Sequence, residues 1–118
     1  MFKATTIILS VGLSVAAGAA GAWERIQTEA QYRERVAGRQ ITLENGHVTF
    51  AADGSAAGAW NGTPMVGSWT WSDGFHCRTL RIGSNDLGTD CQLIELQGNE
   101  LRATAQRGQG RVTTASLN

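Results

Sequence analysis

Turn signals recur at intervals of about 8 to 12 residues through most of this chain, and they constrain its fold more than any other feature. Each joins Asn or Asp to Gly, a dipeptide suited to the tight turns of β-hairpins. The turn signals are Asn45-Gly46, Asp53-Gly54, Asn61-Gly62, Asp73-Gly74 and Gly98-Asn99. Short segments of alternating apolar and polar residues separate them, which predicts antiparallel strands that follow one another as a meander.

The same alternation predicts eight strands. The expected spans are residues 39–43, 47–51, 56–60, 65–71, 75–82, 89–96, 101–105 and 111–117. Strands connected in this way either close into an up-and-down barrel or curl into a half-open clam of two packed sheets, and the short strands favour a small, flattened barrel. We therefore predict a mainly β, calycin-like fold. Its interior is either filled by side chains or large enough for one small ligand, and the pattern is consistent with both.

Residues 24–37 carry the helical signal that precedes these strands. Thr28 and Gln31 fit a capping box, Glu29 favours the positive end of the helix dipole, and Gly38 suits the C′ position. So short a helix persists only when it packs on something. We expect it to cover one end or one open edge of the barrel.

The first 22 residues have the layout of a secretory signal peptide. Lys3 supplies the positive charge, residues 7–17 are apolar, and Ala20-Gly21-Ala22 matches an A-x-A cleavage site. The apolar run is shorter than the roughly 20 residues of a membrane-spanning helix, which favours a cleaved signal over an anchor. We predict a single mature β-rich domain, residues 23–118, that is periplasmic or secreted and has no stable membrane insertion.

Cys77 and Cys91 are the only two cysteines. In an exported protein such a pair predicts one disulfide, and the two predicted strands that carry them are consecutive and therefore expected to be neighbours. A bridge that closes a loop of about 15 residues stabilises a fold by about 3 kcal/mol in chain-entropy reasoning. A redox or metal role would need a partner arrangement such as C-x-x-C, which is absent.

The charge pattern gives no indication of a polyanionic partner. Ten basic residues balance ten acidic ones, Lys3 is the only lysine, and no basic run is present. Nucleic acids and anionic membrane surfaces attract proteins with a basic excess or a basic cluster. We therefore expect no nucleic-acid partner.

The densest group of chemically versatile residues is the run W-T-W-S-D-G-F-H-C-R, residues 69–78. Trp69 and Trp71 share one face of a predicted strand and have two interpretations. They fill a core otherwise short of large side chains, or they form an aromatic platform with Trp60 and Phe75 that stacks a sugar ring or another flat ligand.

In this run Cys77 is assigned to the disulfide, Asp73-Gly74 to a turn and the tryptophans to the core or a platform. His76 and Arg78 have no such structural role. Arg78 either pairs with an acidic residue at the surface or serves as an anion clamp in the barrel mouth. His47 and His76 show no metal-ligand spacing with each other or with an aspartate. The predicted ligand-binding residues are Trp69, Trp71, His76 and Arg78, and no metal or cofactor is predicted.

Catalytic motifs are lacking. No G-x-S-x-G elbow is present, and the two cysteines are expected to bridge, which leaves no thiol nucleophile. No G-x-G-x-x-G follows a strand and opens a helix, and Gly108-Gln-Gly110 lies between two predicted strands as a turn. The sequence therefore predicts no catalytic residue.

The W-T-W-S-D-G-F-H-C-R run, the later C-Q-L at residues 91–93, V-x-G-R at residues 36–39 and Asp53-Gly54 resemble a group of small exported bacterial proteins of unknown function. The likeness covers most of residues 30–110 and is weakest over residues 106–114. It implies a shared fold and not a reaction. Some members carry the label dihydrodipicolinate reductase, but that activity needs a nicotinamide-binding domain, for which this chain has no motif.

Three functions follow in order of preference. The first is a non-enzymatic barrel that binds a small ligand or a periplasmic protein, favoured by a cavity with a convergent arginine. The second is a structural or inhibitory protein that acts through its loops, favoured by a filled barrel with an exposed apolar patch. The third is an enzyme, favoured by a buried polar cluster around His76 with perturbed titration.

Overall fold

Nine strands and two short helices make up residues 21–118, the part of the chain described by the structure, which is a computed structural model. The predicted signal peptide lies outside the described residues except for its last two positions. The elements are β1 (Glu24–Arg25), α2 (Glu29–Arg35), β2 (Gln40–Leu43), β3 (Gly46–Phe50), β4 (Ser55–Trp60), β5 (Thr63–Ser72), β6 (Phe75–Ile82), β7 (Asn85–Gln97), β8 (Glu100–Thr104), α3 (Ala105–Gly108) and β9 (Val112–Leu117).

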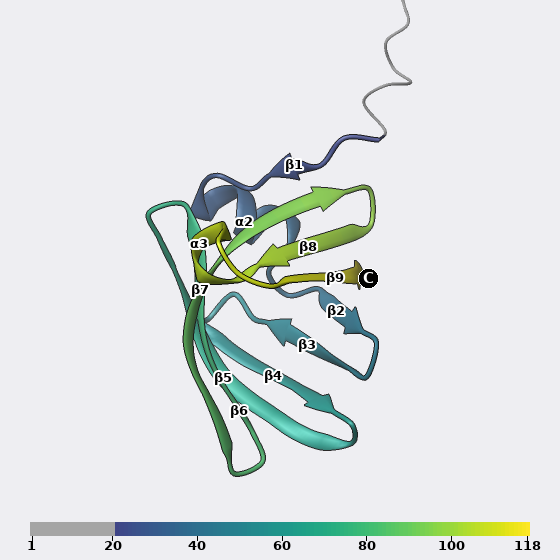
Figure 1. The fold of residues 1–118 in the computed structure, drawn as a ribbon, viewed down its shortest axis with the longest axis vertical. Helices are drawn as coiled ribbons and strands as arrows, with labels where there is room; N and C mark the ends of the chain where they lie inside the picture. Colours follow the sequence, from purple (N-terminus) through teal and green to yellow (C-terminus); the bar gives the residue numbers. More distant parts are fainter. Residues whose placement is uncertain (1–20) are drawn as a thin grey trace, which may run out of the picture.

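Strands β2 to β9 close into an eight-stranded antiparallel barrel (Figure 1). Each strand pairs with the next in sequence, and β2 pairs with β9 through Ile41–Leu117 and Thr42–Ser116 to complete the circle. The predicted antiparallel meander is confirmed, and of the closed and half-open forms that the sequence left open the structure has the closed one. Since the two ends of the sheet pair with each other, the barrel has no fully open edge strand.

Glycines allow the strands of this small barrel to approach and bend. A Cβ on Gly58 would overlap the carbonyl oxygen of His47, and one on Gly67 would overlap that of Thr79. Both glycines face neighbouring strands within regular pairing. The absence of side chains at these positions therefore permits the tight coiling of β3 to β6.

Strand β7 begins earlier than its sequence indicates. Gly83 to Gly88 was expected to be a loop, yet pairing with β6 starts at Asn85. Leu80 pairs with Gly88 and Arg81 with Asp86, so Leu87 is the extra residue of a β-bulge. The tight turn before Asn85 imposes the pairing, which overrides the low strand propensity of this Gly- and Asp-containing segment.

One edge of β7 has two successive neighbours. Residues up to Gln92 pair with β6, and Glu95 and Leu96 pair with the two-residue strand β1. The opposite edge pairs with β8 from Leu93 onward. Strand β1 was not predicted, because two residues are too few to show alternation.

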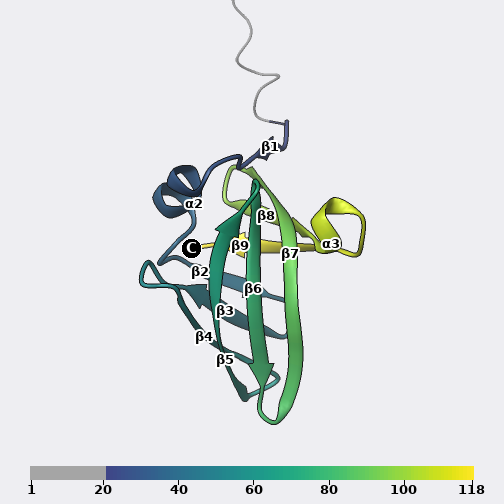
Figure 2. The same ribbon diagram turned by 90° about the vertical axis from the view of Figure 1, so that its left-hand side faces the viewer.

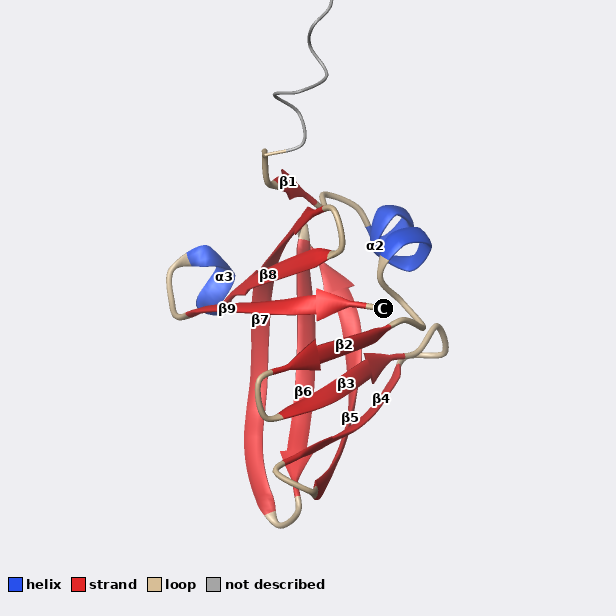
Figure 3. Ribbon diagram, turned by 90° about the vertical axis from the view of Figure 1, so that its right-hand side faces the viewer, coloured by secondary structure: helices blue, strands red, loops and turns tan. Residues whose placement is uncertain are grey.

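Helix α2 lies against one end of the barrel (Figures 1 and 3). Its predicted capping box is present: the Thr28 hydroxyl accepts from the Gln31 backbone N–H, and the Gln31 side chain accepts from the Thr28 N–H. Tyr32 of α2 is buried in the core. The helix ends earlier than expected, with Val36 as C-cap, so Gly38 is not the C′ residue although its φ is +83°.

The connection between β8 and β9 contains the short element α3, where the sequence predicted a turn over residues 107–110. Gln106 and Arg107 have left-handed φ angles of 54°, so α3 is a strained turn more than a regular helix. The Gln106 backbone N–H donates to the Asp90 carboxylate at 3.0 Å. This bond ties the segment to β7, and Figure 2 shows α3 beside the barrel wall.

The disulfide between Cys77 and Cys91 is present and joins β6 to β7. The two residues are direct partners in the strand register, with their Cα atoms 3.9 Å apart. The bridge therefore fixes the pairing of these two strands, as predicted.

Candidate ligand cavity

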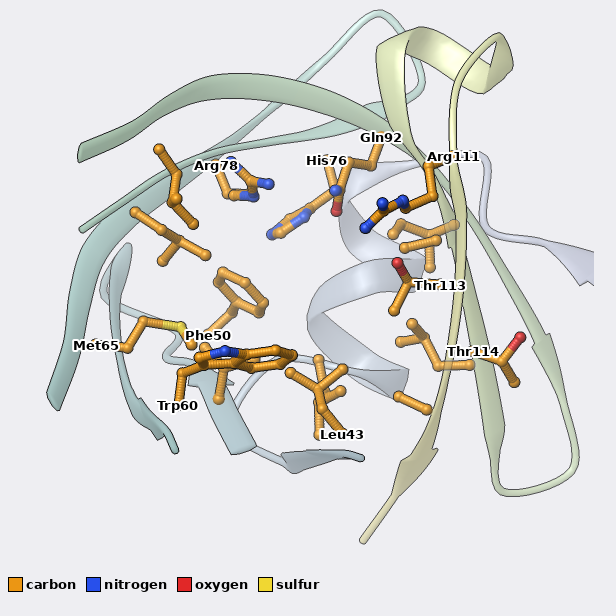
Figure 4. Close-up of a pocket in the computed structure, with 18 of the residues that line it drawn as sticks. Leu43, Phe50, Trp60, Met65, His76, Arg78, Gln92, Arg111, Thr113 and Thr114 are labelled. Atoms are coloured by element: carbon orange, nitrogen blue, oxygen red, sulfur yellow. The ribbon is translucent and has the colours of Figure 1, made fainter. Parts of the chain in front are cut away.

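A cavity of about 650 Å³ lies inside the barrel (Figure 4). This volume falls within the range of about 300 to 1,000 Å³ typical of small-molecule sites. The sequence was consistent with a filled or a hollow interior, and the structure has a hollow one. The residues that surround the cavity come from α2, from strands β2 to β9, from the turn between β2 and β3 and from Arg111 just before β9.

Most of the cavity wall is apolar. Trp60, Phe50, Met65 and Leu43 lie together on one side of it (Figure 4). Further apolar side chains in the wall are Ile41, Val48, Leu80, Ile82, Ile94, Leu101, Ala103 and Ala115. Such a surface binds apolar ligand groups through the hydrophobic effect.

The opposite wall carries nitrogen-bearing side chains. Arg78 and His76 come from β6, Gln92 comes from β7, and Arg111 precedes β9; Figure 4 shows all four across the cavity from Trp60. Gln92 pairs with His76 in the strand register, and its amide donates to Asp90 at 3.1 Å. The cavity is therefore amphipathic, with an apolar wall facing a cationic one.

His76 is packed among aromatic rings. It stacks on Tyr32 with ring centroids 4.6 Å apart, and the ring of Phe50 meets it edge-on at 4.4 Å. Only 1% of the residue is exposed, and among the described residues neither Nδ1 nor Nε2 has a hydrogen-bond partner. Burial, aided by the positive charge of Arg78, lowers the pKa of His76 to about 3, so the imidazole is neutral at ordinary pH.

Tyr32 closes the end of the cavity beneath α2. Its ring lies 4.9 Å from Trp69 and 5.5 Å from Trp71, in addition to its stacking on His76. Burial raises the pKa of the Tyr32 phenol, which therefore stays protonated. Tyr32 is therefore the residue by which α2 contributes to the cavity wall, and it closes one end of the barrel.

The structure divides the four predicted site residues. His76 and Arg78 line the cavity, whereas Trp69 and Trp71 pack on Tyr32 outside it. Trp69 is buried, and its Nε1 donates to the Ala51 carbonyl at 2.7 Å, as expected of a core residue.

The structure does not assemble the predicted aromatic platform. Trp60 lines the cavity, but Phe75 is not among the lining residues and its ring contacts the guanidinium groups of Arg25 and Arg107. The platform is therefore divided between the cavity, the core and the outer surface, and Trp60 is the indole that a cavity ligand can meet.

The rim of the cavity includes exposed apolar side chains. Leu87 is 42% exposed and Val112 is 53% exposed, and both line the cavity. The bulge in β7 accounts for the position of Leu87, because an extra residue reverses the side-chain alternation beyond it. Glu44 and Arg111 contribute opposite charges to the same rim.

Sequence reasoning named Trp60 only as a member of the aromatic platform and did not name Arg111 or Leu87, although alternation contains a signal for Trp60 and Arg111. Trp60 is four residues from buried Ala56 and so lies on the same strand face. Arg111 is four residues from buried Ala115 and falls on the same side by the same alternation. Leu87 gives no such signal, because a bulge cannot be seen in the alternation.

Residues 21–118 contain no cluster of three or more His, Cys, Asp or Glu side chains arranged to hold a metal ion. Neither helix in this part of the chain is long and apolar enough to cross a membrane. Comparison with protein-family models, with curated proteins and with solved structures found no match to this chain.

Proposed function

We propose that this protein is an exported, non-enzymatic binding protein that holds one small, mainly apolar ligand inside its barrel. The cavity of about 650 Å³ carries the proposal. A closed eight-stranded barrel can fill its interior with side chains, and a hollow interior of ligand size in so small a chain costs packing contacts. A bound ligand would restore the packing contacts that a hollow interior lacks.

The rim supports entry of an apolar molecule. Leu87 and Val112 expose apolar surface beside the cavity. Apolar side chains at the entrance favour the passage of an apolar ligand. Apolar side chains elsewhere on the outside of the strands would have no such effect. The same two residues are the basis of the second candidate function, in which the rim contacts a partner protein and the cavity stays unused.

The surroundings of His76 favour binding over catalysis. A general acid or base works best with a pKa near the working pH. Burial takes the pKa of His76 far below that range, and aromatic rings cover the imidazole on both sides. His76 lacks a carboxylate or hydroxyl partner among the described residues, so no proton relay runs through it.

Two observations support export. The disulfide requires an oxidising compartment to form and persist in most organisms. The predicted signal peptide and the resemblance to small exported bacterial proteins point to the same compartment.

Titration with N-phenyl-1-naphthylamine, a neutral fluorescent probe that brightens in apolar surroundings, tests the binding function. We expect saturable binding of one probe per chain. Ala103→Trp fills part of the cavity and should weaken binding about tenfold or more, which is 1.4 kcal/mol. Ala57→Trp is the matched control, because Ala57 is exposed on the outside of β4. Absence of saturable binding, or equal binding by both variants, would contradict the proposal.

Native mass spectrometry of protein purified from its own periplasm separates the two candidate functions. A retained small molecule supports the cavity function. A co-purifying protein whose binding is lost in Leu87→Ser and Val112→Ser, and kept in Ala103→Trp, supports action through the rim.

A further inference from the structure

Seven of the nine arginines in the described chain have an ion pair, an aromatic ring or a hydrogen bond of 3.2 Å or less to a carbonyl oxygen, whereas Arg78 has only a longer carbonyl contact. Arg33, for example, pairs with Glu29 at 2.8 Å, and Arg102 pairs with Glu95 at 2.9 Å. The seven are Arg25, Arg33, Arg35, Arg39, Arg81, Arg102 and Arg107. The remaining two, Arg78 and Arg111, both line the cavity.

Arg78 is half-buried and has no carboxylate within ion-pair distance among the described residues. Its one hydrogen bond is a long one, 3.4 Å, to the Gly88 carbonyl. Asp90 lies opposite it in the strand register, but the Asp90 oxygens accept from Gln92 and from the Gln106 backbone. Burial lowers the pKa of Arg78 and the Asp90 charge opposes this, so the guanidinium lacks full compensation.

Arg111 stands at the rim on the same wall. Figure 4 shows its guanidinium directed into the cavity beside His76 and Thr113. Glu44, the acidic residue of the cavity lining, is exposed and forms no ion pair with Arg111 in the described chain. Two guanidinium groups therefore face the interior without a carboxylate paired to either of them in residues 21–118.

We propose that the ligand is an amphipathic anion, with a carboxylate or similar oxyanion at the Arg78–Arg111 wall and an apolar, preferably flat body against Trp60 and Phe50. This inference rests on the proposed binding function and names the chemical class of its ligand. Guanidinium groups donate paired hydrogen bonds that match the oxygens of a carboxylate. The arrangement selects molecules that carry both features, because each wall satisfies one of them.

A matched pair of probes tests the inference. N-phenyl-1-naphthylamine and 8-anilinonaphthalene-1-sulfonate share one skeleton and differ by a single sulfonate. We expect the sulfonate probe to bind the intact, disulfide-bonded protein about tenfold more tightly at low salt. Arg78→Gln and Arg111→Gln should each lower that preference about fivefold or more. Arg81→Gln, on the outer face of β6 and paired with Asp86, should keep it.

The outcomes separate the two proposals. If neither probe binds, the binding function itself fails. If both probes bind with equal affinity, or if the preference survives in both cavity arginine variants, the anion inference is overturned and the binding function stands. Arg111 is exposed, so Arg111→Gln should fold even where Arg78→Gln does not. For the wild-type protein, added salt should weaken the sulfonate probe more than the neutral one, and equal weakening would also overturn the inference.

Discussion

At the scale of single residues, His76 stands out because its two ring nitrogens are the buried side-chain polar atoms of residues 21–118 that lack a hydrogen-bond partner. An unpaired buried donor or acceptor costs about 1–3 kcal/mol, and the imidazole has both ring nitrogens unpaired. Its stacking on Tyr32 and its contact with Phe50 offset part of that cost through aromatic packing. The fold therefore tolerates the neutral ring and strongly disfavours the charged one.

This preference predicts a specific acid sensitivity. The unfolded chain protonates His76 near its ordinary pKa of about 6.5, whereas the folded protein resists protonation down to a pKa of about 3. The contribution of His76 to stability is complete above pH 7 and is lost as the pH falls between these values, by up to about 1.4 kcal/mol per pH unit. Urea unfolding of wild type and His76→Phe from pH 7 to pH 4 should show the variant losing less stability.

Carboxylates titrate in both proteins, so their contribution to the pH dependence of stability cancels in the difference between the two curves. His47→Phe is a suitable control, because His47 is exposed on β3. Parallel curves for wild type and His76→Phe would show that His76 is not held neutral by the fold.

The same residue scale shows where sequence reasoning stops. Alternation groups Trp69 with Trp71 and His76 with Arg78, but it does not show which face of a strand is interior or how far along the barrel a residue lies; the structure places all four on the interior face. Trp69 lies beneath α2 and is sealed by Tyr32, while Arg78, on the same interior surface, reaches the cavity. Which interior positions meet a ligand depends on where the helix plugs the barrel, and no local pattern encodes that.

At the scale of elements, turn chemistry determines most of what could be predicted. Asn61 and Asp73 adopt positive φ angles beside Gly62 and Gly74, as tight hairpins require, and all eight predicted strands are present. The departures occur where tertiary pairing acts on weak local signals: β1, the first half of β7 and α3 are each too short or too polar to identify alone.

The β6–β7 hairpin carries the prediction that belongs to this scale. Its disulfide links two directly paired residues 14 positions apart. Chain entropy assigns such a loop about 3 kcal/mol, and about 1 kcal/mol shifts the Tm of a domain of this size by about 4–8 °C. Cys77→Ala/Cys91→Ala should therefore lower the Tm by about 12–24 °C in a thermal melt followed by circular dichroism.

Reduced wild-type protein is the control for that variant and should melt with it. A double variant that melts like the oxidised protein would show that strand pairing alone fixes the hairpin and that the bridge adds no stability.

At the scale of the whole molecule, closure makes a hollow interior possible. Pairing of β2 with β9 completes the barrel, α2 seals one end, and the disulfide fixes the longest strand. A wall supported in this way does not need a packed interior to keep its shape. The cavity should therefore exist before a ligand enters, and binding should not rearrange the fold.

A preformed cavity predicts how a ligand changes stability. A molecule that binds only the folded state, at a free concentration of 100 times its Kd, adds about 2.7 kcal/mol to the free energy of unfolding. N-phenyl-1-naphthylamine at that concentration should raise the urea midpoint accordingly without changing the m-value, because m follows the surface exposed on unfolding. Ala103→Trp, with binding weakened about tenfold or more, should gain about 1.4 kcal/mol or less at the same probe concentration, and Ala57→Trp the full amount. A rise in m would mean that the empty protein is less compact and that the ligand completes the barrel.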